Sequence, residues 1–221
     1  AEPRPAPNPS PDPPFMALRL CGALLNLCLV VAEVLPWPSD SIGERTTERV
    51  SAGKRAGKFI ACTVCEHVIQ STLPTSNEAE DIRKILTSED YVEKLGDAKA
   101  NCGMKRLARL FKGLKLEVAA LSDGTAELRR SHSEPFYEEI NKSDLAFHWK
   151  SFAVEHACME IFRQDADTVH RTMLKEFDKL VMGSLEGEQE IRMQMRIAAQ
   201  TACGRAKFCR ASHELRRQNE L

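Results

Sequence analysis

The stretch KFIACTVCEHVI, residues 58–69, decides the fold of this chain. Its apolar side chains recur at intervals of three and four residues, which places them on one face of a helix. The same face carries two cysteines, Cys62 and Cys65. We therefore predict a helix that begins at Lys58 and turns both thiols toward the interior of a domain.

Four further cysteines extend this pattern along the chain. Two are single and two form a close pair in the segment CGRAKFC; they are Cys102, Cys158, Cys203 and Cys209. Two close pairs that bracket two single cysteines suit a nested disulfide framework. Such a framework staples an N-terminal and a C-terminal helix side by side, while a middle bridge closes an inner hairpin. Six cysteines can pair in many ways, so the order alone leaves the partners open.

Residues 16–32 are typical of a secretory signal peptide. Arg19 precedes an apolar run that contains Cys21 and Cys28 and ends in small residues, which predicts cleavage after Ala32. A permanent membrane anchor is the weaker alternative, because the run of about a dozen residues is shorter than the roughly 20 that span a bilayer. Thiols oxidise in the secretory pathway, so the remaining cysteines are expected as disulfides.

The rest of the chain divides by composition. We expect the Pro-rich residues 1–15 not to belong to the natural product and residues 33–57, rich in Ser, Thr, Arg and Glu, to form a flexible segment. Residues 58–209 are long enough for one domain with its own core, and residues 210–221 form a polar tail. The net charge of −1 lacks the basic excess of a nucleic-acid-binding protein.

Helical spacing continues through most of the domain. The predicted fold class is mainly α, a disulfide-stapled helical domain with one inserted β-hairpin. One expected helix begins at Glu78 and buries Ile82, Ile85 and Leu86, and a short one is capped by Ser88. Further helices are expected over residues 97–110, from about 143 to 162, 165–182 and 185–207, the last with Ile197 inward.

The helical period breaks between Cys102 and Cys158. Apolar and other side chains alternate over residues 114–120, and Ser-Asp-Gly-Thr at 122–125 is typical of a tight turn. We predict that residues 114–120 pair antiparallel with 126–130 as the only sheet of the domain. The face that holds Leu116 and Val118 should be buried, because a lone hairpin is marginal in water.

The order of the cysteines, CxxC, C, C and then C-x5-C, resembles the saposin-like superfamily. Within it, the inserted hairpin, the aromatic-flanked segment FHWKSFAVEHACMEIF and the ending QNEL are similar to the canopy proteins of the endoplasmic reticulum. The resemblance implies that the first cysteine joins the last, the second the fifth and the third the fourth. In this chain those pairs are Cys62 with Cys209, Cys65 with Cys203, and Cys102 with Cys158.

The resemblance also implies a function. Canopy proteins assist the folding and export of membrane receptors, so this chain is expected to be a non-enzymatic lumenal chaperone or co-chaperone of the endoplasmic reticulum. Its partners would be client membrane or secreted proteins. The ending resembles a KDEL-type retrieval signal. That signal would consist of Gln218, Asn219, Glu220 and Leu221.

A saposin-type lipid-binding or membrane-active protein is the alternative, and it would be secreted or sent to lysosome or vacuole. Basic side chains line one side of the segment around residues 104–115, as in an interfacial helix drawn to anionic lipid. A core helix with a solvated basic face has the same pattern. These side chains are Lys105, Arg106, Arg109, Lys112 and Lys115.

Other chemistry at the cysteines is less favoured. The CxxC pair could be redox-active, but no βαβ unit precedes Cys62. A zinc site of the four thiolates in the two close pairs is a second alternative. Neither HExxH nor GxSxG occurs, so we predict no enzyme, no cofactor and no metal. Asn141-Lys142-Ser143 is an acceptor sequence for N-glycosylation.

Overall fold

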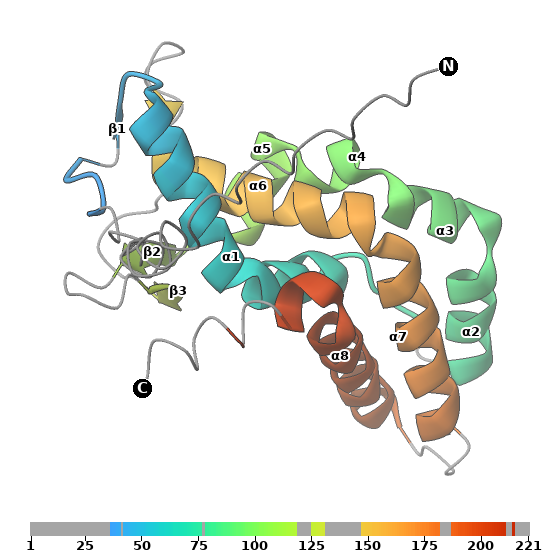
Figure 1. Ribbon diagram of the computed structural model, residues 1–221. Coiled ribbons are helices and arrows are strands. Elements are labelled where there is room, and N and C mark those ends of the chain that lie inside the picture. The colour runs from blue at the N-terminus through green and yellow to red at the C-terminus, as the bar shows by residue number, and fades with distance from the viewer. Residues whose placement is uncertain are drawn as a thin grey trace, which may run out of the picture. The chain divides into compact units, whose positions relative to one another are not determined.

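The computed structural model describes residues 36–40, 42–76, 78–118, 125–130, 147–181, 187–210 and 214. They belong to one compact unit, Pro36–Leu221, and are mainly helical (Figure 1). The proposed signal peptide, the glycosylation sequence at Asn141 and the retrieval signal at 218–221 lie outside the described residues. No helix among the described residues is long and apolar enough to cross a membrane.

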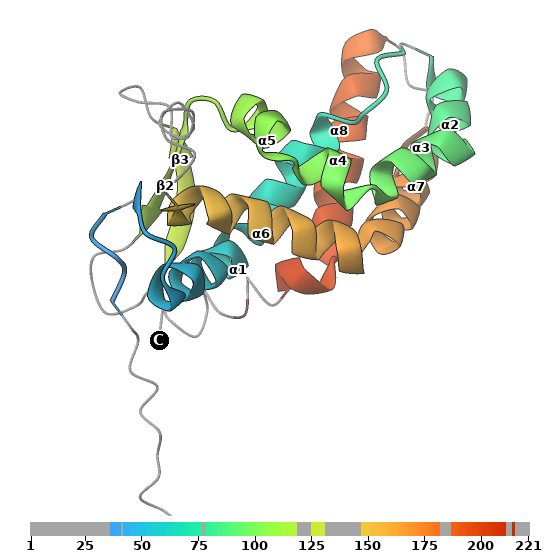
Figure 2. The same ribbon diagram turned by 90° about the horizontal axis from the view of Figure 1, so that it is seen from above.

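Two long helices, α1 (Thr47–Gln70) and α6 (Trp149–Gln164), lie side by side in both views (Figures 1 and 2). The start of α1 corrects our prediction, because it begins at Thr47 rather than Lys58. Residues 47–57, expected as part of a flexible segment, form the first turns of this helix, and Thr46 caps it by accepting a hydrogen bond from the Arg49 N–H.

Small residues explain why the first turns of α1 pack without large apolar side chains. Ala52, Gly53, Ala56 and Gly57 are buried against α6. A Cβ added at Gly53 would lie 2.6 Å from Phe152 Cδ1, so the backbones approach closely there. A helix is recognised in a sequence by the spacing of its large apolar side chains. This contact face has glycine and alanine instead, so its burial is not evident from the sequence.

A chain of short helices crosses from α1 to the hairpin. They are α2 (Ala79–Thr87), α3 (Glu89–Gly96), α4 (Ala98–Cys102) and α5 (Met104–Leu110). Ser88 caps α3 as predicted, accepting from the Tyr91 N–H at 3.3 Å. The single helix predicted over residues 97–110 is wrong: it breaks at Gly103, whose extended backbone (φ −61°, ψ 137°) separates α4 from α5.

The C-terminal half supplies a second helix pair, α7 (Ala166–Val181) and α8 (Glu188–Arg205), which pack on each other. Helices α2 and α3 lie against α7, and α8 lies against α1. Val169, Met173 and Phe177 are fully buried. Two predicted core residues are instead exposed, Ile85 at 40% and Ile197 at 41%. Ile85 lies at the edge of the apolar stripe of α2, and Ile197 lies on the face of α8 opposite the buried Met195 and Ala199.

The predicted hairpin is confirmed. Strand β2 (Leu114–Val118) pairs antiparallel with β3 (Ala126–Arg130), and Leu116 lies opposite Leu128. Leu116 is fully buried and Val118 is partly buried, packed against the core, so the expected face is turned inward. The hairpin contacts α1, which gives two strands the helix support that they need in water.

The expectation that this hairpin is the only sheet is wrong. Strand β1 (Ile42–Gly43) pairs with β4 (Phe147–His148), joining the N-terminal segment to the start of α6. The same segment stacks Trp37 on Trp149, with ring centroids 5.7 Å apart, and the Trp149 Nε1–H donates to the Asp40 carbonyl at 2.9 Å. Residues 36–40 and 42–43 therefore form a strap over the N-terminal ends of α1 and α6.

Disulfides tie the helices together. Cys65 is bonded to Cys203 and Cys102 to Cys158, with Cα atoms 5.8 and 5.6 Å apart, and both are pairs that the saposin-like resemblance implies. They span 138 and 56 residues of sequence, which in the chain-entropy model stabilises the fold by roughly 4 to 5 kcal/mol each.

The third expected bridge, Cys62 to Cys209, is not formed in the structure. Cys209 follows the end of α8, where Ala206 turns the chain out of the helix, and its thiol meets Cys62 through a hydrogen bond rather than a covalent bond. The hydrogen bond with Cys62 and burial both raise the pKa of Cys209, so the thiol stays protonated.

Candidate functional site

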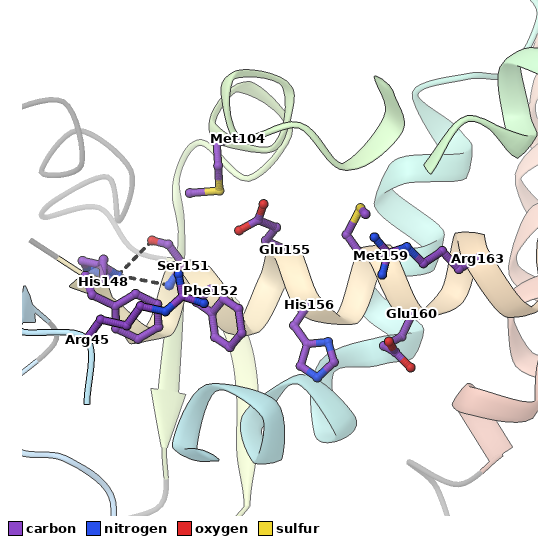
Figure 3. A pocket seen from close by; sticks show the side chains of 11 residues that line it. Arg45, Met104, His148, Ser151, Phe152, Glu155, His156, Met159, Glu160 and Arg163 are labelled. Atoms are coloured by element: carbon purple, nitrogen blue, oxygen red, sulfur yellow. Dashed lines mark hydrogen bonds between the residues drawn. The ribbon is translucent and has the colours of Figure 1, made fainter. Parts of the chain in front are cut away.

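A cleft of about 530 Å³ runs along α6 and is the candidate functional site (Figure 3). Apolar and charged side chains alternate in its lining. The apolar ones are Met104, Phe147, Phe152 and Met159. The polar and charged ones are Arg45, His148, Ser151, Glu155, His156, Glu160 and Arg163.

Helix α6 positions most of the lining through its own periodicity. Residues four apart lie above one another on a helix, so Ser151, Glu155 and Met159 form one row and Phe152, His156 and Glu160 form a second. In Figure 3, Glu155 and Met159 extend from α6 on the side of Met104, whereas His156 and Glu160 extend from the other side. The cleft therefore presents two chemically different flanks.

The wall opposite the first row comes from α5. Met104 begins this helix and reaches toward α6 (Figure 3). The disulfide between Cys102 and Cys158 ties the residues just before Met104 to the middle of α6, beside Met159. A covalent bond thus fixes the spacing of the two methionines that face the cleft.

Arg45, which follows strand β1, lines the cleft together with Phe147. Strand β1 pairs with β4 and so holds Arg45 near Phe147, where the guanidinium carbon lies 5.4 Å from the ring centroid. Such a cation–π contact contributes on the order of 1 kcal/mol. Phe147 in turn packs on Phe152 with centroids 5.3 Å apart.

Glu155 is a partly buried carboxylate at the middle of the cleft. Burial raises the pKa of Glu155, and attraction to Arg45 opposes that shift. The described residues supply no hydrogen-bond donor and no ion-pair partner to this carboxylate. A carboxylate in such surroundings gains from any cation brought to it.

His156 lies on the other flank, where its ring stacks on Phe152 with centroids 5.7 Å apart. Burial lowers the pKa of His156, with Lys54 and Lys58 acting in the same direction and Glu160 against it. The imidazole is therefore neutral near pH 7 and adds a flat, apolar surface. The Gln164 amide donates to Glu160 at 2.6 Å and so occupies that carboxylate.

His148 and Ser151 form the N-terminal cap of α6. The Nδ1 atom of His148 accepts from the Ser151 N–H at 3.0 Å and lies 2.8 Å from the Ser151 hydroxyl oxygen. Burial is the main reason that the pKa of His148 falls to about 4, with a smaller effect of Lys150. The Ser151 side chain is only 1% exposed, so the pair is placed to cap a helix rather than to meet a substrate.

The cysteines offer no metal site among the described residues. The bond between Cys65 and Cys203 uses two of the four thiols on which the zinc hypothesis rested. No group of three or more histidine, cysteine, aspartate or glutamate residues in the described part of the chain is arranged to hold an ion.

A second hollow, of about 210 Å³, lies between the turn after α1 and helices α2 and α8. Arg192 and Arg196 line it, and both are exposed. Arg192 is paired with Glu188 one turn earlier in α8. This hollow is smaller than the cleft along α6.

Sequence reasoning found the frame of the site but not its lining. The predicted disulfide residues stand next to the cleft through Cys102 and Cys158, yet none of them lines it. The available signal was the unusual mixture of aromatic, acidic and histidine side chains in residues 147–162, around Cys158. Nothing in the sequence indicated that Arg45 belongs to the site, because only the pairing of β1 with β4 brings it to α6.

Comparison with known proteins identifies no relative of this chain. No family model, no curated protein and no solved structure matches this chain. The likeness to saposin-like and canopy proteins therefore stays a prediction from cysteine order, hairpin and tail.

Proposed function

We propose that this chain is a non-enzymatic holding chaperone of the endoplasmic reticulum lumen, and that the cleft along α6 binds an extended segment of an unfolded client. The observation that carries the proposal is the lining of the cleft. Met104 from α5 and Met159 from α6 lie on the same side of α6, and Phe147 and Phe152 add apolar surface to the lining.

Methionine suits a site that accepts many sequences. Its unbranched side chain and polarisable sulfur adapt to irregular surfaces, so Met104 and Met159 can pack on different client side chains. Rigid walls complement these flexible groups. The Cys102–Cys158 bond fixes the spacing of the walls, so binding energy is not lost in ordering the site.

The two disulfides support a lumenal location, since bridges of this kind persist in oxidising compartments. The predicted signal peptide and the ending QNEL point the same way. The Ser151–His148 pair at the cleft supports a non-enzymatic role, because both residues are buried and their hydrogen bonds cap α6.

Lipid binding is the second candidate. Its sequence support was the segment around residues 104–115, with a basic side and an apolar side. In the structure Leu107 and Phe111 are fully buried in the core, so the side assigned to lipid is occupied by the protein itself. We therefore rank lipid binding below client binding.

The test is suppression of aggregation. The oxidised protein is mixed with a denatured, disulfide-containing secretory protein, and light scattering is followed with time. We expect the wild type to suppress scattering near equimolar ratio. A double variant, Met104→Gln with Met159→Gln, should lose most of this effect because the amides demand hydrogen bonds that an apolar client cannot supply.

The matched control is Met193→Gln. Met193 is 56% exposed on α8 and does not line the cleft, so its variant should hold the client like the wild type. Equal suppression by the double variant and the control would contradict the cleft as the client site. Flotation with anionic vesicles, without suppression of aggregation, would favour the lipid candidate.

A further inference from the structure

The carboxylate of Glu155 stands among apolar groups without a partner of its own. It projects on the same side of α6 as Met159, and Met104 faces both (Figure 3). No ion pair or hydrogen bond within the described residues reaches it, and only a longer-range attraction to Arg45 acts on it. Other carboxylates near by are engaged; Glu160, for example, accepts from Gln164.

Arg45 forms no ion pair with Glu155. Its guanidinium lies over the Phe147 ring, where the β1–β4 pairing holds its backbone. Arg163, a further cation of the lining, is exposed and shares no ion pair with Glu155. Among the described residues, therefore, none neutralises the Glu155 carboxylate by direct contact, and this side chain lines the cleft.

We infer that Glu155 makes the cleft selective for a cationic side chain: a client segment binds with a lysine or arginine between Met104 and Met159, its charge on the Glu155 carboxylate. The inference rests on the proposed function and names the class of segment that the cleft takes. The side chains of Met104 and Met159 would pack on the methylene stem of that residue, as apolar surfaces do for long basic side chains.

Charge complementarity distinguishes this occupant from a purely apolar one. An apolar side chain would remove water from Glu155 without replacing its hydrogen bonds, which is costly for a carboxylate. A basic side chain replaces them with a charge-assisted pair, the stronger class of hydrogen bond. Burial raises the pKa of the free Glu155 carboxyl, and a bound cation should lower it again.

The test uses three labelled peptides on the oxidised full chain, followed by fluorescence anisotropy. Each has leucine and phenylalanine flanks, and the central residue is lysine, norleucine or glutamate. We expect the dissociation constant of the lysine peptide to be about tenfold lower than that of the norleucine peptide, which is the effect of one modest charge-assisted hydrogen bond. The glutamate peptide should bind more weakly than both.

Glu155→Gln should abolish the preference for lysine while the norleucine peptide binds as well as before or better. The control Glu93→Gln changes an exposed carboxylate on α3, outside the cleft, and should keep the preference. Glu155→Lys should reverse it in favour of the glutamate peptide. Thermal unfolding of each variant checks that it is folded.

Each outcome decides a separate question. Equal binding of lysine and norleucine peptides to the wild type overturns the inference but leaves client binding intact, and this comparison needs no variant. A preference that survives Glu155→Gln overturns it as well, because the selecting charge is then elsewhere. Failure of all three peptides to bind overturns the proposed client site and the inference with it.

Discussion

Cys209 lies against Cys62 in a hydrogen bond, while their neighbours Cys203 and Cys65 are joined by a disulfide. The two pairs connect the same elements, since α1 carries Cys62 and Cys65 and the end of α8 leads from Cys203 to Cys209. The Cys65–Cys203 bond therefore holds Cys62 and Cys209, the outer pair, near each other. Oxidation of their two thiols would join them in a disulfide.

We expect this outer pair to oxidise when the protein is exposed to a glutathione redox buffer poised as in the endoplasmic reticulum. The new bridge should stabilise the fold by about 3 kcal/mol at most, because with Cys65 and Cys203 already bonded it closes a ring of only about a dozen residues. A non-reducing peptide map should link Cys62 to Cys209, and the melting temperature should rise.

The raised pKa of Cys209 makes the reaction slow near pH 7 and faster at higher pH, since the thiolate is the attacking form. Cys209→Ser should lose the gain in melting temperature, whereas the alkylation pattern of Cys102 and Cys158 stays unchanged. A map that links Cys62 to Cys65 would show that the nested arrangement is incorrect.

At Gly53 of α1, an added side chain would clash with α6. Gly53→Ala should lower the free energy of unfolding by about 1 kcal/mol, because overpacking against Phe152 and the Trp149 carbonyl outweighs the gain in helix propensity. Thermal unfolding by circular dichroism measures this.

The matched control is Gly204→Ala on α8, where an added Cβ meets no atom within 4 Å. It should raise the free energy of unfolding by up to about 1 kcal/mol through helix propensity. If both variants were stabilised equally, the close approach of α1 and α6 at Gly53 would be incorrect.

His148 should make stability fall in acid. Burial lowers its pKa from 6.5 to about 4, so the neutral ring is favoured in the folded state. Its contribution is fully present above pH 6.5 and is lost as the pH falls toward 4, by roughly 3 kcal/mol at most. Urea unfolding at pH 7 and pH 4.5 measures the change.

The variant His148→Asn keeps a side-chain oxygen to cap α6 but does not titrate. It should lose clearly less stability between the two pH values than the wild type. Burial lowers the pKa of His67 and His156 as well and raises that of Glu155, but these groups are common to both proteins. An unchanged difference between pH 7 and 4.5 would exclude His148 as the main acid-sensitive group.

The tail separates the two candidate functions. The proposed retrieval signal at 218–221 needs a free carboxylate at Leu221, so extending the chain by a few residues should release the protein into the medium of its native cells. Immunoblots of cells and medium measure the retained fraction. Equal secretion of both forms would contradict retrieval through QNEL and favour a secreted lipid-binding protein.

Local pattern was enough for most helices and for the hairpin. The spacing of Ile191, Met195 and Ala198 identified a helix that the structure contains, and alternation with a turn signal identified the antiparallel strands β2 and β3. The side chains that share one face of a helix or strand are only two to four residues apart, so the spacing of apolar residues in the sequence reveals these elements directly. The start of α1 at Thr47 escaped this method because its contact face is built from glycine and alanine.

By itself, the sequence determined the mainly helical class and the hairpin, whereas the three disulfide pairs, of which two are formed, came from the resemblance to saposin-like proteins. Tertiary structure alone decided the cleft, because Arg45, Met104 and Glu155 come from three segments that meet only after folding. It also decided that no described residue pairs with the Glu155 carboxylate, since pairing depends on where the other charged side chains lie. Periodicity reports which face of a helix is buried, whereas a binding site depends on which faces meet.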